Sequence, residues 1–266
     1  MESQTESPLP TVSGPPSLQG INILLVNPNS TEYMTKDCLK AIAPNLPPNV
    51  TVHGFTAPRP SPTAIESQTD AILSSEACLR AIKPIAHNYD AFLVACFRAH
   101  PLIAVLKEEF IQPVLGIMEA AMYAARILGE RMGILCMSAR SGLVHGRAVS
   151  AYGFSEYFVG CEAVQLGVLE LESRPKEEVH EVISNAMNRL VRDKGADCIL
   201  LGCAGMAEMR SICEAVVEET GVRVLDGVGL GVQFLTGLIR ERLGTAKSGF
   251  YMDASIDRAK RGQDWL

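Results

Sequence analysis

The sequence feature that most constrains the fold is an internal repeat with a spacing of about 110 residues. Three pairs of segments match: 90–96 (DAFLVAC) with 197–203 (DCILLGC), 23–26 (ILLV) with 133–136 (GILC), and 113–116 (PVLG) with 223–226 (RVLD). The first pair has a spacing of 107 residues and the other two have a spacing of 110. Three matches at nearly one spacing predict two copies of a four-stranded α/β unit.

Short apolar runs alternate along the chain with stretches of helical periodicity. The runs are nearly continuous hydrophobics, which is typical of parallel strands covered on both faces. They span 21–26, 50–55, 91–96, 114–117, 132–137, 157–161, 198–201 and 222–225. The helical stretches include 31–43, 65–86, 176–194 and 207–220. The predicted fold class is α/β, with two pseudo-symmetric lobes, each a four-stranded parallel sheet flanked by helices, and an active site in the cleft between them.

The repeat also predicts where the lobes begin and end. The first lobe is expected to comprise residues 21–117 together with 226–245, and the second lobe residues 118–225. Residues 1–20 carry four prolines and many polar residues but almost no large apolar side chain, so we expect a disordered tail there. Residues 246–266 are expected to form a C-terminal tail, in which Arg258, Lys260 and Arg261 are solvated charges.

Composition and charge exclude several function classes. The net charge of −6 argues against a nucleic-acid partner, because phosphate contacts need clustered Lys and Arg. No apolar stretch approaches the roughly 18 residues of a membrane span, and the N-terminal segment does not resemble a secretory signal. We therefore expect a cytoplasmic enzyme with a small-molecule substrate and without a membrane or nucleic-acid partner.

The chain has eight cysteines, which in a reducing compartment are expected to be free thiols. There is no Cys-x-x-Cys pair and no Cys/His cluster at structural zinc spacing, so no metal site is predicted. Six of the cysteines lie within predicted helices or strands and are interpreted as small buried hydrophobes: Cys38, Cys78, Cys136, Cys161, Cys198 and Cys213.

Cys96 and Cys203 differ from the other six because each ends the equivalent strand of its own lobe. Ligands of open α/β sheets bind beyond the carboxyl ends of the strands, so the packed lobes would place one thiol on each side of a shared cleft. Asp90 and Asp197 begin the same strands, about 20 Å away at 3.3 Å per residue, and are interpreted as strand-entry residues.

Two thiols on opposite sides of one carbon could serve as the acid and the base of a racemase that needs no cofactor. Racemisation removes a proton from one face of a carbon and returns a proton to the other face. A thiol has an ordinary pKa of about 8.5, which is close enough to neutrality for either role. Cys96 and Cys203 each precede a predicted helix, whose N-terminal N–H groups would stabilise a thiolate.

The residues around both cysteines resemble those of a known family. Asn27-Pro28-Asn29-Ser30-Thr31 follows the first strand, and the other matching segments are 95–97 (ACF), 116–121 (GIMEAA), 201–206 (LGCAGM) and 225–228 (LDGV). Together they resemble the hydantoin racemase branch of the aspartate/glutamate racemase superfamily, and within it the fungal Dcg1-like members. The resemblance runs from about residue 21 to residue 243 and implies racemisation without pyridoxal phosphate or another cofactor. It also implies that Cys96 and Cys203 are the acid/base pair.

The resemblance implies a set of substrate contacts as well. These are Asn27, Ser30, Phe97, Arg98, Glu119, Ser138, Ala204 and Gly205. Asn27 and Ser138 are equally suited to start helices, and Glu119 is equally suited to be a solvated glutamate in a first helical turn. Segment 60–66 is similar to a family loop that covers the site, while Asp226 is expected to fix the start of the last long helix.

One position departs from the family pattern. Bacterial hydantoin racemases carry an aspartate three residues after the first cysteine, where this chain has Ala99, next to Arg98 and His100. Loss of the negative charge at Ala99, next to the positive charge of Arg98, would allow an anionic ligand to bind. His100 is interpreted as a structural histidine at a helix start, with assistance in proton transfer as the alternative.

Three functions follow as hypotheses. The first is a racemase or epimerase acting on a carbon next to a carbonyl, in a cyclic ureide such as a 5-substituted hydantoin or allantoin, or in a related amino-acid derivative. The second is a cysteine-dependent isomerase or decarboxylase of the same superfamily, and the third is a catalytically silent ligand-binding relative. A homo-oligomer is expected because relatives tend to assemble.

Overall fold

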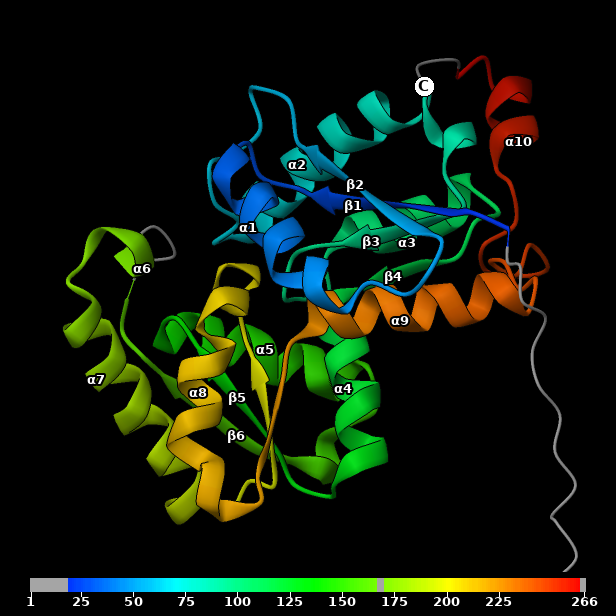
Figure 1. Ribbon diagram of the computed structural model, residues 1–266. Coiled ribbons are helices and arrows are strands. Elements are labelled where there is room, and N and C mark those ends of the chain that lie inside the picture. Colours follow the sequence, from blue (N-terminus) through cyan, green and yellow to red (C-terminus); the bar gives the residue numbers. More distant parts are fainter. Residues whose placement is uncertain (1–18, 167–169, 264–266) are drawn as a thin grey trace, which may run out of the picture.

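The computed structural model describes residues 19–166 and 170–263 and contains two parallel four-stranded sheets (Figure 1). The first sheet has the order β2-β1-β3-β4 and the second has the order β6-β5-β7-β8. The strands are β1 (Ile21–Asn27), β2 (Val50–Thr56), β3 (Ala91–Val94), β4 (Val114–Gly116), β5 (Met132–Cys136), β6 (Phe158–Ala163), β7 (Cys198–Leu201) and β8 (Arg223–Leu225). The second order repeats the first with every strand number raised by four, so the predicted duplication is confirmed.

Helices flank both sheets. They are α1 (Glu32–Ile42), α2 (Gln68–Ile82), α3 (Pro101–Glu109), α4 (Ile117–Leu128), α5 (Ala139–Ala151), α6 (Glu170–Ser173), α7 (Lys176–Asn188), α8 (Arg210–Val217), α9 (Gly227–Arg240) and α10 (Ser255–Lys260). The helix expected over 65–86 begins only at Gln68, because Ser67 and Asp70 form a capping box at its start. The stretch expected over 207–220 is divided into a 3₁₀ segment, Ala204–Met209, and α8.

Alternation along the first strand explains how helices cover both faces of the sheet. Ile23 and Leu25 pack in one buried cluster with α1, α4 and α9, while Leu24 and Val26 pack in another with α2 and α3. Successive side chains of a strand point to opposite faces, so an uninterrupted apolar strand requires a helical layer on each side.

The two lobes share one hydrophobic core. The cluster that contains Ile23 of β1 also contains Ile134 of β5, and α4 and α9 pack against each other between the sheets (Figure 1). Gly227 makes this approach possible, because a Cβ there would lie only 2.0 Å from the carbonyl oxygen of Ile117. The shared core holds the carboxyl ends of both sheets in a fixed relation.

Part of the C-terminal segment packs on the first lobe, while Lys260 and Arg261 are exposed, as expected for a solvated tail. Arg258 of α10 pairs with Glu109 at 2.6 Å, and the Glu109 side chain is almost fully buried. Lys247 donates hydrogen bonds to the carbonyl oxygens of Lys107 and Glu108 at the end of α3. Buried carboxylate and carbonyl groups on α3 therefore attract the cations of this segment.

The disorder predicted for residues 1–20 lies, apart from the last two of them, outside the described part of the chain. Among the described residues, no helix combines the length and the apolar character that a membrane span requires.

Candidate active site

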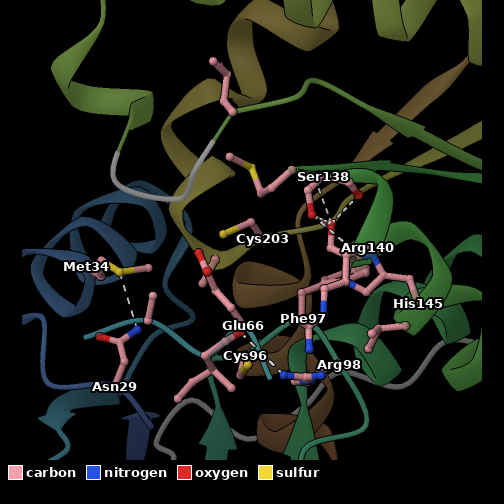
Figure 2. Close-up of a pocket in the computed structure, with 18 of the residues that line it drawn as sticks. Asn29, Met34, Glu66, Cys96, Phe97, Arg98, Ser138, Arg140, His145 and Cys203 are labelled. Carbon is pink, nitrogen blue, oxygen red and sulfur yellow. Dashed lines mark hydrogen bonds between the residues drawn. The ribbon is translucent and has the colours of Figure 1, made fainter. Parts of the chain in front are cut away.

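A pocket of about 380 Å³ lies where the carboxyl ends of the two sheets meet (Figure 2). In each sheet the strand order reverses beside the first strand, between β1 and β3 and between β5 and β7. Such switch points open a crevice beyond the strand ends. The pocket lining comes from the loops after these four strands, the 64–66 loop, the start of α5, Met34 of α1 and the segment after β6. The volume suits a small organic ligand.

Cys96 and Cys203 both line this pocket, and each is half-buried. Each follows the third strand of its lobe by two residues, because β3 ends at Val94 and β7 at Leu201. Figure 2 shows the two sulfur atoms beside the same space, Cys203 on the side of the second lobe and Cys96 on the side of the first. The sulfurs are close enough for ionised Cys203 to raise the pKa of Cys96.

Burial dominates the ionisation of both thiols. It raises the pKa of Cys96 to about 12, against the positive charge of Arg98, which lowers it. Burial raises the pKa of Cys203 to about 11, against hydrogen bonds from the backbone N–H groups of Gly205 and Met206. Both thiols are therefore protonated near neutral pH, and one of them has to lose its proton before the pair can exchange protons with a ligand.

The expected helix start is found at only one of the two cysteines. Cys203 lies directly before the 3₁₀ segment Ala204–Met209, whose first N–H groups reach its sulfur. Cys96 is separated from α3 by residues 97–100, so the nearby positive charge is the Arg98 guanidinium and not a helix terminus. The prediction was wrong for Cys96 because Pro101 and His100 start the helix four residues later.

Asn27 and Ser30 do not line the pocket, although the resemblance implied that they contact a ligand. The Asn27 amide is buried and donates to Asn29, Thr31 and Thr35, so it organises the turn after β1. Asn29, which the sequence analysis did not single out, is the member of the turn that reaches the pocket.

Ser30 acts on the pocket through the 61–67 segment. Its hydroxyl donates to the carbonyl oxygens of Ser61 and Pro62, at 2.9 and 3.3 Å. From the other side, the Arg98 guanidinium donates to the carbonyl oxygens of Ile65 and Ser67, at 3.5 and 3.2 Å. These bonds hold Ala64, Ile65 and Glu66 against the pocket, which is where the expected covering loop was placed.

The second lobe contributes the start of α5 and the segment after β6. Ser138 lines the pocket and caps α5 through reciprocal hydrogen bonds with Ser141. Arg140, Ser141 and His145 of α5 also line the pocket. Gln165 does so with a positive φ of 58°, a conformation that few non-glycine residues adopt. Sequence reasoning missed these residues because no spacing links them to the cysteines.

Glu119 does not line the pocket, although the resemblance implied that it contacts the substrate. β4 is the edge strand of its sheet, so the first turn of α4 begins away from the β1/β3 switch point. The Glu119 carboxylate is buried near Lys107, with Oε1 3.9 Å from the ammonium nitrogen. Its Oε2 has no hydrogen-bond partner among the described residues.

Of the remaining predicted contacts, three line the pocket and one does not. Phe97, Arg98 and Ala204 line the pocket, and Gly205 does not, although its N–H faces Cys203. The Phe97 ring meets the His145 ring edge-on at 5.3 Å, which joins the two lobes beside the pocket. Ala99, the departure from the family pattern, is exposed and does not line the pocket.

Several structural interpretations are confirmed. The imidazole of His100 caps α3 by accepting the Leu102 N–H, and burial lowers its pKa to about 3. Asp226 caps α9 by accepting two backbone N–H groups. The carboxylates of Asp90 and Asp197 accept N–H groups at strand entries, far from the pocket. These groups therefore have structural partners.

Comparison with known proteins decides the family. A family model described as Asp/Glu/Hydantoin racemase matches residues 23–235. The chain belongs to this family. It is 31% identical over 220 residues to a hydantoin racemase of Pseudomonas sp. (strain NS671), which covers 82% of this chain and 86% of that protein. An uncharacterized protein of Schizosaccharomyces pombe is 35% identical over 238 residues, covering 89% of this chain and all of the relative.

A solved structure of the allantoin racemase from Pseudomonas fluorescens agrees with the two-lobed architecture. It has a TM-score of 0.81 and 27% identity, and the match covers 88% of this chain and 97% of that chain. The family and these relatives indicate that the protein is a racemase or isomerase, which confirms the predicted enzyme class.

Proposed function

We propose that this protein is a cofactor-independent racemase or epimerase in which Cys96 and Cys203 are the acid/base pair. The observation that carries the proposal is that these two thiols, alone among the eight cysteines, line one pocket from equivalent positions of the two lobes. Exchange of a proton on both faces of one carbon requires two such groups.

In the proposed reaction one cysteine is a thiolate and the other a thiol. The thiolate removes the proton from the carbon, and the electron pair moves onto the adjacent carbonyl oxygen. The opposite thiol then donates its proton to the other face, which leaves the pair with its charges exchanged. Arg98 and Arg140 line the pocket, and their positive charge would stabilise the negative oxygen.

The proposed substrate is a cyclic ureide, such as a 5-substituted hydantoin or allantoin, because relatives named hydantoin racemase and allantoin racemase share the fold. Asn29, Glu66 and Gln165 supply amide and carboxylate groups that suit ring N–H and C=O groups. Apolar side chains, including Ile65, Val144 and Leu166, leave room for an uncharged substituent.

The test is chiral detection of product from a panel of single-enantiomer hydantoins, allantoin and free amino acids. We expect the wild-type protein to invert at least one cyclic ureide. Cys96→Ser and Cys203→Ser should each stop inversion, since a hydroxyl ionises far less readily than a thiol. Cys78→Ser, which changes a buried thiol of α2 outside the pocket, is the matched control and should retain inversion. Inversion that survives both pocket substitutions would exclude the two thiols from the reaction.

Mass spectrometry distinguishes proton exchange from the alternative of a cysteine-dependent isomerase, which would leave a covalent substrate adduct on one thiol. Proton exchange leaves both sulfurs unmodified. Homo-oligomer formation and a cytoplasmic location stay predictions.

A further inference from the structure

We propose that Cys136, His145 and Cys161 form a binding site for a thiophilic metal ion of the Zn²⁺ class, behind the wall of the pocket. The site uses neither Cys96 nor Cys203, although His145 also lines the pocket. No motif in the sequence predicts this site, and Cys136 and Cys161 were interpreted as packing residues.

Three elements of the second lobe bring the ligands together. Cys136 ends β5, Cys161 lies on the neighbouring strand β6, and His145 lies on α5, which packs against both strands. Cys161 is paired with Ile134, two residues before Cys136, so both thiols point to the same face of the sheet. The two sulfurs and a ring nitrogen of His145 all lie within 4.8 Å of one another.

The backbone of α5 approaches this cluster closely. A Cβ at Gly142 would lie 3.3 Å from the Cβ of Cys161 and 3.4 Å from the sulfur of Cys136. Glycine at this position therefore lets the helix lie directly against the two thiols. The resulting cluster is enclosed, since Cys136 and His145 are buried and Cys161 is partly buried.

One polar atom of the cluster is left without a partner. His145 is only 4% exposed, and its Nδ1 has no hydrogen-bond partner among the described residues. The thiols donate to the carbonyl oxygens of Ser138 and Gly142, each at a sulfur–oxygen distance of 3.5 Å. Buried polar groups are normally hydrogen-bonded, and leaving one unpaired is unfavourable. Ligation of a metal would give a buried ring nitrogen a partner.

Metal binding would require both cysteines as thiolates, which is the form of cysteine that binds metals. Binding of the ion would therefore release the two thiol protons to solvent, with no change in oxidation state and no need for an oxidant.

The donor set selects the class of ion. Two sulfurs and one imidazole nitrogen suit Zn²⁺, whereas Mg²⁺ and Ca²⁺ require oxygen ligands. Sulfur ligands of one tetrahedral zinc, at bond lengths of about 2.3 Å, are separated by about 3.8 Å. The two sulfurs lie at most 4.8 Å apart, so they need to approach each other by about 1 Å at most to bind one zinc ion. Three protein ligands leave one position to water.

The test is titration of the full-length reduced protein with Co²⁺, a spectroscopic substitute for Zn²⁺, followed by displacement with Zn²⁺. We expect one equivalent of Co²⁺ to produce a thiolate-to-cobalt charge-transfer band that Zn²⁺ abolishes. Cys136→Ser and Cys161→Ser should reduce the bound metal from about one equivalent to near zero. Cys213→Ser, which changes a buried cysteine of the same lobe, is the control and should bind like wild type.

X-ray absorption at the zinc edge of the wild-type protein tests the site without any variant. Two sulfur ligands and one nitrogen from imidazole are the expected first shell. A band that persists in Cys136→Ser and Cys161→Ser would overturn the proposal, as would a band lost in the Cys96→Ser/Cys203→Ser double variant. Absence of a charge-transfer band in the wild type would overturn it as well. Neither metal-binding measurement depends on racemase activity, so failure of the proposed function would leave the metal-binding result unaffected.

Discussion

The two lobes have the same strand order, yet they support their pocket thiols by different means. In the second lobe, neutral backbone N–H groups of Gly205 and Met206 face Cys203. In the first lobe, the charge of Arg98 acts on Cys96, and Arg98 is itself hydrogen-bonded to the 61–67 segment. The duplicated scaffold therefore fixes the positions of the two sulfurs, whereas local loops set how readily each sulfur ionises.

The largest expected effect concerns pH. Burial raises the pKa of Cys203 to about 11 and that of Cys96 to about 12, so the active form with one thiolate becomes more abundant as the pH rises. We expect kcat/KM to increase about tenfold per pH unit from pH 7 to pH 10. Initial rates of inversion across this range check the prediction. A plateau already reached below pH 8 would show that at least one of the two thiols ionises more readily than its burial implies.

The next largest effect is expected from a substitution at Arg98, which supports the thiol of the first lobe only. Arg98→Met removes the charge that lowers the pKa of Cys96 and also releases the 61–67 segment. We expect kcat/KM to fall by about an order of magnitude, because the Cys96 thiolate loses its neighbouring positive charge. Enantiomers are equally stable, so the fall should be equal in both directions.

Arg98→Lys is the matched control, because it keeps the charge but lacks the planar guanidinium. Its kcat/KM should lie between those of Arg98→Met and wild type. Equal losses in the two variants would assign the effect to the hydrogen bonds with the 61–67 segment and not to the charge.

A smaller effect is expected where the lobes differ in helix capping. Asp226 caps α9 with its carboxylate, whereas Gly116, its counterpart in the repeat, begins α4 without a side-chain hydrogen bond. Asp226→Ala should lower the free energy of unfolding by about 1 kcal/mol in urea titrations. Asp257→Ala, at an exposed position of α10, is the control and should leave it nearly unchanged. Equal stability of both variants would contradict a structural role for Asp226.

The comparison of the lobes also explains how much the sequence could predict. Strand order, covering helices and the placement of Cys96 and Cys203 follow from local apolar patterns that occur twice, so they were accessible from the repeat. Ser138 was found for the same reason, as the residue after β5 that corresponds to the turn after β1.

What the sequence could not predict depends on contacts between distant segments. Glu119 follows a strand end as the other candidates do, and only the edge position of β4 places it outside the pocket. The contact of Arg258 with Glu109 joins residues 149 positions apart. The cluster of Cys136, His145 and Cys161 has no repeated counterpart and no metal-binding spacing, so only the folded lobe brings its members together.

The central claim is that each thiol serves one face of the same carbon, and deuterium exchange in heavy water tests it most directly. Cys96→Ser should exchange the substrate's carbon-bound hydrogen in only one enantiomer, without inverting it, because Cys203 still removes and returns a proton on its own face. Cys203→Ser should do the same with the opposite enantiomer alone. Exchange of the same enantiomer by both variants would contradict the claim, and so would inversion in either of them.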